Sequence, residues 1–520
     1  MKVKHLLYTL LLFITIFKPG NIIAHTPTWT DGIACIIYSH CTSCHNPKGI
    51  APFSLTRYED VFANRLSIAA SVQAGSMPPF PPNENKRKYA HTNTLTQHER
   101  DDIIRWVNNF APLGNADNIP APPVYNNNFQ MNDADVVLQI PTFTVNTTND
   151  LYRIFVLPLN NATQKFIEKI EVVPGNREIV HHALVFQDSS TLPLQLDNND
   201  PLPGYSAFGG TGSITSKLIN GYTPGQGVFQ YPPGFGAAVL PGSYICLQIH
   251  YPGGISNQVD STQIRIKFGA GTLRNVTTVA ALNHNTTLTN GPLFIPANTI
   301  KTFYSQQNVS TNRTLTGIMP HMHLLGKQIR SYCIKPDGDT IHLIDIPKWD
   351  FHWQGFYQFQ KPILIPAGST VYGEATYDNT SSNPDNPNFP PRDVRQGEGT
   401  DDEMMLIYFN LSAYQPGDTN IIIDTSTHIA HLNNCSNTEA NTDPNKIQIY
   451  PNPSQGQFTI DGINNGFNIV MYSSSGQEVL VRKGLSGLTV ITEHKLPAGT
   501  YYLEIITEDN QRFYKVVVLF

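Results

Sequence analysis

Hydrophobic residues recur at helical spacing near the start of the chain, and they alternate with polar residues over most of the remainder. Thr96 and Glu99 form a capping-box pattern just before apolar residues that lie three and four positions apart, as in an amphipathic helix. These apolar residues are Ile103, Ile104, Trp106, Val107 and Phe110. Farther on, segments 136–140 and 264–268 alternate as half-buried strands do. The pattern predicts a small helical unit followed by a long all-β region.

Two polar linkers divide the chain into units. The first is rich in Pro and Asn over residues 115–129, and the second covers residues 431–444. About 300 residues lie between them, which is long enough for two β-sandwiches rather than one. We expect a multidomain protein with a small all-α domain (25–115), two all-β, jelly-roll-like sandwiches (125–280 and 281–430) and a C-terminal immunoglobulin-like β-sandwich (444–520). The junction between the two middle sandwiches is expected within 275–290.

Composition and charge narrow the class of protein. The chain of 520 residues is too long for one hydrophobic core, and only 14% of its residues are charged. Its net charge is -6, with no basic block. A nucleic-acid partner is therefore excluded, because binding to the phosphate backbone needs clustered positive charge.

The first 24 residues have the pattern of a signal peptide. Lys2 and Lys4 precede an apolar stretch from Leu6 to Phe17, and small and polar residues follow up to Ala24. No later stretch is as apolar, so we expect an exported mature chain without a transmembrane segment.

Four of the six cysteines are candidates for disulfides. Cys35, Cys246, Cys333 and Cys435 remain once Cys41 and Cys44 are assigned to the motif described next. In an oxidising compartment these four can form two disulfides, with three possible pairings that the sequence leaves open.

Residues Cys41–His45 form the C-x-x-C-H pattern of covalent c-type haem attachment. The two thiols add to the haem vinyl groups, and the imidazole of His45 is held beneath the iron as an axial ligand. A disulfide or redox pair beside an unrelated histidine is the alternative. The helical unit resembles the short cytochrome c modules that bacteria fuse to extracellular oxidoreductases.

The second axial ligand is expected downstream on a helix-free segment. Met77 precedes Pro78 and Pro79, which exclude an ordinary helical core position. A thioether opposite histidine suits electron transfer rather than oxygen chemistry. The other candidates are His40, His91 and His98, and a buried core methionine is the alternative for Met77.

Three groups of histidines lie in strand-like segments of the middle region. They are His181 with His182, then His250, and then His321 with His323. Residues two apart on a strand share a face, so His321 and His323 can converge on one ion. His181 and His182 diverge in a regular strand, and need a strand end or different ring nitrogens to share a metal. Imidazoles with a soft thioether, such as that of Met404, suit copper in an oxidising compartment.

The order of these motifs resembles the copper type II, ascorbate-dependent monooxygenases, which include peptidylglycine α-hydroxylating monooxygenase and dopamine β-monooxygenase. The matching motifs are His-His, Leu-Gln-Ile-His-Tyr, His-x-His-Leu-Leu-Gly-Lys and Asp-Glu-Met, over residues 130–430. The resemblance implies two coppers per chain in two sandwiches that face a solvent-filled cleft. The electron-transfer copper would be bound by His181, His182 and His250. The oxygen-binding copper would be bound by His321, His323 and Met404.

The resemblance also implies hydroxylation of an activated C–H bond with O2, in a small organic or peptide-like substrate. Tyr408 matches a substrate-side tyrosine of the family. The peptide enzyme carries an arginine at the position of Met319 and an asparagine at that of Leu406, which counts against a peptidyl-glycine substrate. We expect the fused haem to replace or supplement ascorbate, or another external donor, as the reductant. A non-catalytic extracellular electron-transfer or copper-binding protein is the alternative.

The last 75 or so residues resemble the sorting domain of the type IX secretion system. The Tyr450-Pro-Asn-Pro453 turn and the strand entry Gly499-Thr-Tyr501 carry this resemblance. An immunoglobulin-like adhesion module is the alternative, since both are small sandwiches. The resemblance implies the type IX machinery as a partner and a location at the cell surface or outside the outer membrane.

Overall fold

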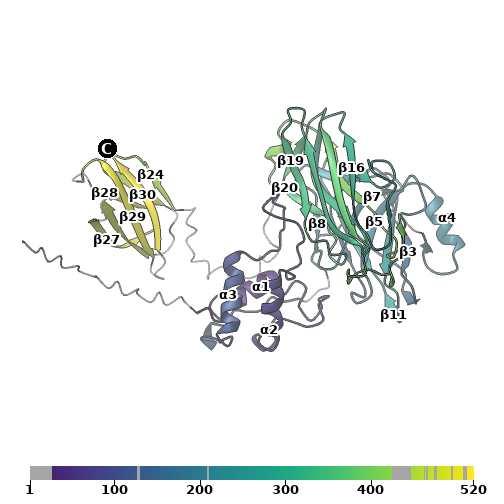
Figure 1. Cartoon of the computed structure of the whole chain (residues 1–520), viewed down its shortest axis with the longest axis horizontal. Coiled ribbons are helices and arrows are strands. Elements are labelled where there is room, and N and C mark those ends of the chain that lie inside the picture. The colour runs from purple at the N-terminus through teal and green to yellow at the C-terminus, as the bar shows by residue number, and fades with distance from the viewer. Residues whose placement is uncertain are drawn as a thin grey trace, which may run out of the picture.

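The computed structural model describes residues 26–125, 129–207 and 210–423, and most of 447–520 apart from 462, 464–465, 474–476, 494–495 and 508–511. These residues form a small helical unit and three β-sandwich units (Figure 1). The predicted mostly-β, multi-sandwich architecture is confirmed. The proposed signal peptide (1–24) lies outside the described residues.

Three helices pack around one core in the N-terminal unit. They are α1 (Ile33–His40), α2 (Tyr58–Ala74) and α3 (Gln97–Asn108), with a 3-10 turn η1 (Ala116–Asn118) after them. The predicted capping box is present, because Thr96 accepts from the Glu99 backbone and Glu99 accepts from the Thr96 backbone. Ile103, Trp106 and Val107 are buried. The prediction that Phe110 belongs to the helical apolar face is wrong, since α3 ends at Asn108 and Phe110 is 88% exposed.

The first sandwich consists of two main sheets, in the orders β1-β12-β4-β9-β13 and β6-β3-β10-β5-β7, with β8 beside β4 and a β11-β2 ribbon. Their inner faces share one apolar core. The predicted strands 136–140 and 264–268 correspond to β1 and β12. The elements are β1 (Val136–Gln139), β2 (Phe143–Thr147), β3 (Leu151–Pro158), β4 (Lys165–Val173), β5 (His182–Asp188), α4 (Leu192–Asn199), β6 (Tyr205–Ser206), β7 (Lys217–Tyr222), β8 (Phe229–Gln230), β9 (Phe235–Val239), β10 (Tyr244–Tyr251), β11 (Ile255–Asp260), β12 (Gln263–Phe268) and β13 (Arg274–Asn275).

The second sandwich pairs the sheet β14-β23-β17-β20 with the sheet β16-β21-β18-β19, with a β15-β22 ribbon at one end. It begins directly after β13, since β14 already pairs with β23. The elements are β14 (Thr277–Asn283), β15 (Phe294–Ile295), β16 (Ile300–Asn308), β17 (Arg313–His321), β18 (Gly326–Ile334), β19 (Thr340–Ile346), β20 (Tyr357–Ile365), β21 (Thr370–Asp378), β22 (Val394–Arg395), β23 (Leu406–Ala413) and the 3-10 turn η2 (Asp418–Asn420).

The C-terminal unit is a smaller sandwich with its own core. Its sheets have the orders β24-β25-β28 and β27-β26-β29-β30. The elements are β24 (Gln448–Tyr450), β25 (Gln457–Asp461), β26 (Gly466–Ser473), β27 (Glu478–Ser486), β28 (Thr489–Thr492), β29 (Gly499–Thr507) and β30 (Arg512–Leu519).

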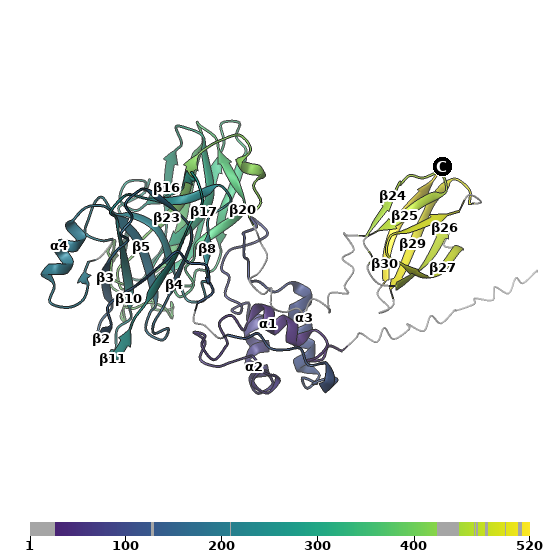
Figure 2. The ribbon, with the colours of Figure 1, turned by 180° about the vertical axis from the view of Figure 1, so that it is seen from behind.

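The first and second sandwiches pack side by side through polar and apolar contacts. Gln358 donates from Nε2 to the Gln230 carbonyl at 2.6 Å, and Thr400 donates to Asp150 Oδ2 at 2.7 Å. Phe356, from the loop before β20, packs against the core of the first sandwich. The first and second sandwiches therefore form one continuous body (Figure 2). The cavity described below lies between them.

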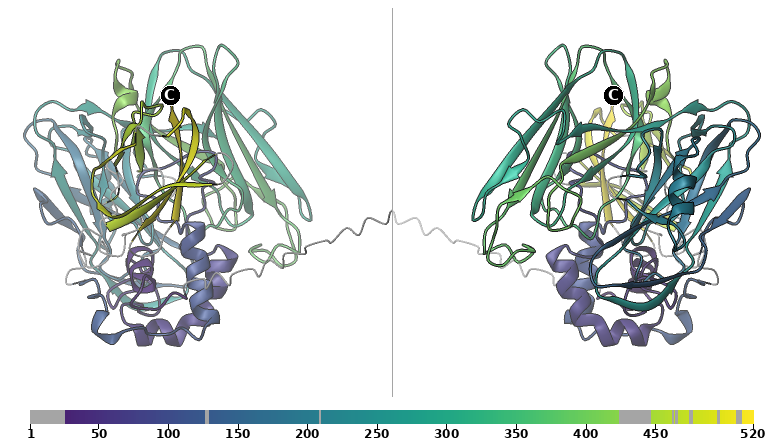
Figure 3. Two further views of the ribbon diagram at one scale, coloured as in Figure 1. Left: turned by 90° about the vertical axis from the view of Figure 1, so that its left-hand side faces the viewer. Right: turned by 90° about the vertical axis from the view of Figure 1, so that its right-hand side faces the viewer.

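The helical unit lies against the ends of both sandwiches (Figure 3). On the second sandwich, Asn83 donates its backbone N–H to the Asp345 carbonyl at 2.7 Å, and Tyr89 donates its hydroxyl to the Leu343 carbonyl at 3.0 Å. Tyr89 is buried within the core of the second sandwich. The segment 83–90 is thus packed on a different unit from the helices that flank it in sequence.

The cysteines do not form two disulfides. Cys246 and Cys333 are free and fully buried on β10 and β18, which belong to different sandwiches. Cys35 is disulfide-bonded, and Cys435 lies outside the described residues. The expectation of two bridges among the four cysteines is therefore wrong, because two of them are enclosed in separate cores.

Within the described part of the chain, no helix is long and apolar enough to cross a membrane.

Candidate metal centres

His181, His182 and His250 form a cluster at one edge of the first sandwich. One ligand atom from each ring lies within 4.8 Å of those of the other two. Nδ1 of His182 is 3.1 Å from Nδ1 of His181 and 3.3 Å from Nδ1 of His250. Two nitrogens bound at about 2 Å to one ion lie about 3.3 Å apart at a tetrahedral angle. The three Nδ1 atoms therefore fit around a single metal ion.

Backbone pairing explains how these histidines meet. His182 is the first residue of β5 and is paired in register with His250 on the adjacent strand β10. His181 precedes the strand, and its backbone N–H donates to the His250 carbonyl at 3.0 Å. Outside the regular strand its side chain need not point away from that of His182. The sequence left two ways for His181 and His182 to share a metal, a strand end or the use of different ring nitrogens. The structure shows a strand end, because β5 begins at His182.

Neighbouring side chains hold the ring of His250 in place. Tyr152 stacks on it, with ring centroids 4.4 Å apart and 5° between the planes. Nε2 of His250 lies 3.5 Å from Asp150 Oδ1. The pKa of the Asp150 carboxyl is lowered to about 2, chiefly by this contact with His250. A carboxylate behind the ring orients the imidazole and strengthens it as a metal ligand.

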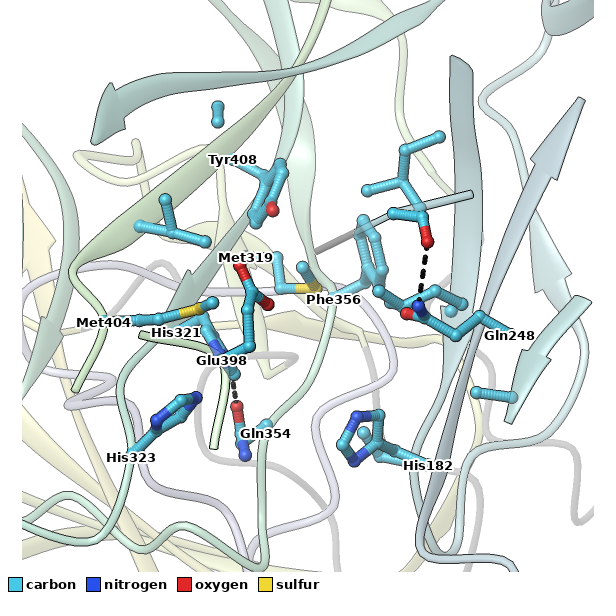
Figure 4. Close-up of a pocket in the computed structure, with 18 of the residues that line it drawn as sticks. His182, Gln248, Met319, His321, His323, Gln354, Phe356, Glu398, Met404 and Tyr408 are labelled. Atoms are coloured by element: carbon cyan, nitrogen blue, oxygen red, sulfur yellow. Dashed lines mark hydrogen bonds between the residues drawn. The ribbon is translucent and has the colours of Figure 1, made fainter. Parts of the chain in front are cut away.

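His321, His323 and Met404 form a second group on the second sandwich. His321 ends β17, and the rings of His321 and His323 are 5.1 Å apart at 84°. Met404 is 7% exposed and lies on the same wall of the cavity as the two rings (Figure 4). An imidazole pair with a thioether is a donor set suited to copper.

Hydrogen bonds fix the tautomers of this second pair. Nδ1 of His323 lies 3.1 Å from the Asp402 carbonyl, and Nδ1 of His321 lies against Gln354 Oε1. Gln354 donates from Nε2 to the Phe351 carbonyl at 2.8 Å, which fixes the orientation of its amide. Both Nδ1 atoms face acceptors and must carry the proton. The Nε2 lone pairs of both rings are therefore the ones left for a metal.

Burial keeps these imidazoles neutral. It lowers the pKa of His181 and His321 to about 4 and that of His323 to about 3. The pKa of His182 is also lowered well below its usual value, by burial and by the neighbouring histidines. Neutral imidazole is the form that binds metal ions.

A buried carboxyl group connects the segments that carry the second group. Glu403 Oε2 accepts from the backbone N–H of His323 at 2.9 Å and of Met404 at 3.1 Å. Oε1 accepts from Leu325 N at 2.7 Å. Burial raises the pKa of Glu403 to about 8. This one side chain thus sets the spacing between the histidine segment and the methionine segment.

A single cavity of about 470 Å³ is lined by His181 and His182 of the first group and by His321, His323 and Met404 of the second. Tyr408 lines it from β23, directly opposite Met319 on β17, and burial raises the pKa of its hydroxyl to about 12. Glu398 extends its carboxyl group toward Met319 and Tyr408 (Figure 4). Within the described lining, Glu398 is the only carboxylate, and no lysine or arginine is present.

Sequence reasoning did not find several side chains of this cavity. Phe351 and Gln354 come from the loop between β19 and β20, and His284 follows β14. His284 accepts the Met405 backbone N–H at Nδ1, 3.2 Å away. None of them belongs to a local motif, so no signal in the sequence pointed to them.

Residues Cys41–His45 follow α1 directly. Both thiols are free. His45 Nδ1 lies 3.1 Å from the Phe53 carbonyl, which leaves Nε2 as the ring nitrogen available for a ligand bond. Met77 lies after α2 and is 37% exposed. Free thiols and a free Nε2 are what covalent haem attachment requires, and both the haem and Met77 as its second ligand remain predictions.

Two family models match the chain. The C-terminal domain of the copper type II ascorbate-dependent monooxygenases matches residues 294–430. Residues 294–430 therefore form a copper monooxygenase-type domain. This span contains His321, His323 and Met404 but not the three-histidine cluster. The secretion system C-terminal sorting domain matches residues 448–519, so the protein is secreted or held at the cell surface.

A search among curated proteins found no match. Among solved structures, PNGase F of Flavobacterium meningosepticum is 12% identical with a TM-score of 0.25, and the match covers 54% of this chain and 97% of that one. PorZ, a surface component of the type IX secretion system of Porphyromonas gingivalis, is 13% identical with a TM-score of 0.14, and the match covers 22% and 14%. A Ruminococcus gnavus β-glucuronidase is 10% identical with a TM-score of 0.12, and the match covers 43% and 35%. At these scores the likeness supports no inference.

Proposed function

We propose that this protein is a copper-dependent monooxygenase that hydroxylates an activated C–H bond of a small organic or peptide-like substrate with O2. The observation that carries the proposal is the pair of ligand groups on the walls of one cavity. His181, His182 and His250 would hold one copper, and His321, His323 and Met404 the other. Copper at these positions would supply one-electron redox chemistry and oxygen binding.

The chain's own residues would divide the remaining tasks. Glu403 and Gln354 hold the second ligand group in its binding geometry. Tyr408, Met319 and Phe356 form the part of the wall on which a substrate would lie.

We further propose that electrons arrive through a haem c on Cys41 and Cys44, with His45 and Met77 as axial ligands, in place of or in addition to ascorbate. Free thiols and an oriented imidazole support this assignment. His40 is the weaker alternative to Met77, because its two ring nitrogens already contact Asn93 and Glu99. The helical unit also contacts the first sandwich, which carries the three-histidine cluster, and this would allow it to act as an internal electron donor.

Elemental analysis of protein that has been matured with haem and loaded with copper tests the proposal. We expect about two coppers and one iron per chain, in line with the two donor sets and one C-x-x-C-H motif. His323→Ala should lose one copper, while His342→Ala, which changes an exposed histidine of the same sandwich, should keep both. Iron without copper would contradict the monooxygenase assignment. Two coppers without substrate-dependent oxygen uptake across a substrate screen would instead favour an electron-transfer or copper-binding protein.

A further inference from the structure

Gly225 of the first sandwich lies against the haem-attachment motif. Gly225 follows β7 with φ of +84°, and a Cβ on it would stand 3.0 Å from Cys44 Sγ. Tyr125, in the linker after the helices, donates its hydroxyl to Thr42 Oγ1 of the motif at 2.7 Å. A side chain at position 225 would therefore push the thiol away from the sandwich.

The same turn forms part of the cavity wall. Tyr222, Thr223 and Pro224 line the cavity together with His181 and His182. Tyr222, the last residue of β7, is paired in register with Ala183 on β5. Ala183 directly follows His182 in the chain. A short covalent stretch and one step across the sheet thus connect the Cys44 contact with the three-histidine cluster.

The helical unit meets the second sandwich through other residues. Asn83, Arg87 and Tyr89 bond to backbone carbonyls of residues 342–345, and none of these three belongs to the C-x-x-C-H motif. Among the described contacts, a haem attached at Cys44 would therefore lie nearer to the three-histidine cluster than to the second ligand group.

We propose that the turn Thr223–Gly225 is the place where an electron passes from a haem on Cys41 and Cys44 to a copper held by His181, His182 and His250. A haem held there would supply one electron, passing from the ferrous to the ferric state, and a copper held by the three histidines would accept it, passing from the cupric to the cuprous state. No bond is broken and no proton is transferred. The inference rests on the proposed function and adds the route and the order in which the two sites are reduced.

The physical reason is distance. Electron transfer through protein falls steeply as the gap widens, and covalent and hydrogen-bonded paths carry it better than gaps through space. A glycine at position 225 lets the thioether edge approach as closely as van der Waals contact permits. A branched side chain there widens the gap at its narrowest point.

The test follows haem reoxidation without oxygen. Protein carrying ferric haem and cupric ions is given one electron by a photochemical pulse, and the haem absorbance reports the internal transfer. We expect Gly225→Val to slow reoxidation at least tenfold. Gly234→Val is the matched control, because Gly234 has φ of +83° but nothing within 4 Å of its Cβ position. It should transfer at the rate of the unaltered protein.

Two further variants keep the route testable if Gly225→Val folds poorly. His182→Ala, which removes the three-histidine site, should abolish the fast reoxidation, whereas His323→Ala should retain it. The opposite pattern, or an unchanged rate in Gly225→Val with haem and copper contents intact, would overturn the route alone. A chain that binds no copper or no haem would overturn the proposed function, and the metal analysis detects this separately.

Discussion

The phenyl ring of Phe351 stacks on the imidazole of His181, with ring centroids 5.5 Å apart and 21° between the planes. The same ring meets His323 edge-on at 6.0 Å and 87°. Phe351 comes from a loop of the second sandwich, while His181 belongs to the first. One aromatic side chain thus contacts both ligand groups and lines the cavity that they share.

Phe351→Ala should weaken the contact between the two sandwiches. Each aromatic contact of this kind contributes about 0.5–1.5 kcal/mol, so we expect a loss of about 1–3 kcal/mol in the free energy of unfolding. Urea denaturation followed by tryptophan fluorescence measures it. Phe389→Ala serves as the control, because Phe389 is 89% exposed and should change nothing. An equal effect of both substitutions would show that the stacking adds no stability.

Met404→Leu should lower the affinity of the second site for Cu(I) without harming the fold. Leucine keeps nearly the same volume but removes the thioether sulfur, and such volume-conserving core changes usually cost less than about 1.5 kcal/mol. A competition titration with a coloured Cu(I) chelator measures the affinity. Met405→Leu is the matched control, since Met405 is the adjacent residue and is fully buried in the apolar core. If Met405→Leu weakened binding as much, sulfur ligation by Met404 would be refuted.

Glu403→Gln should disturb the second site through its backbone. The amide keeps one acceptor oxygen but places an NH2 group where the other oxygen accepts an N–H, so either Leu325 or both His323 and Met404 lose their acceptor. Substitution of residues that orient metal ligands typically lowers metal affinity by about 10–100-fold. Copper binding to the second site is the readout. Glu374→Gln, at a surface ion pair with Arg330 on the same sandwich, should bind copper normally.

The metal-free protein should lose stability as the pH falls. The pKa values of His181 and His321 are about 4 and that of His323 is about 3 in the folded state, below the usual 6.5. Between pH 6.5 and about 4 the unfolded chain therefore binds more protons than the folded one, and stability falls through this window. Glu403 acts oppositely, because its raised pKa of about 8 costs stability as the pH rises from 4.5 to 8.

Thermal unfolding of the metal-free protein between pH 4 and 8 checks both signs. Glu403→Gln should remove the decline as the pH rises from 6.5 to 8, and it should steepen the loss of stability between pH 6.5 and 4.5, where Glu403 opposes the histidines. A melting temperature that stayed constant from pH 6.5 to 4 would contradict the neutral, buried state of the imidazoles.

The single carboxylate of the cavity predicts a preference for cationic ligands. Metal-free protein should bind 2-phenylethylammonium more tightly than 3-phenylpropanoate, which has a similar size and the opposite charge. Glu398→Gln should weaken binding of the ammonium ion by about 1 kcal/mol, roughly fivefold, as for a partly solvated ion pair. Isothermal titration calorimetry measures both ligands. Asp401→Asn, which changes an exposed carboxylate of the same loop, should have no effect.

The sequence predicted those parts of the molecule that depend on local patterns. The strands at 136–140 and 264–268, the capping box at Thr96 and the multi-sandwich architecture need only alternation or a turn of helix to be recognised. The local pattern failed at Phe110, where helical spacing continues past the residue at which the backbone leaves the helix.

The side chains that support the site could not be predicted in the same way. Phe351 meets His181 across 170 positions of the chain, and Thr400 bonds to Asp150 across a separation of 250. Such contacts depend on how the two sandwiches pack, which no local period encodes. Cys246 and Cys333 illustrate the same limit, since only the fold shows that separate cores enclose them.

The burial of Tyr89 in the core of the second sandwich also has a consequence for a protein that works outside the cell. A protein released from the cell is diluted into its surroundings, and it would then meet a freely diffusing partner only rarely. A helical unit anchored through Tyr89 and Asn83 stays at the same effective concentration however far the protein spreads. Cutting this unit away would also expose the rings of Tyr357 and Phe359, which Tyr89 now covers. The helical unit is thus a fixed part of the body that it forms with the second sandwich.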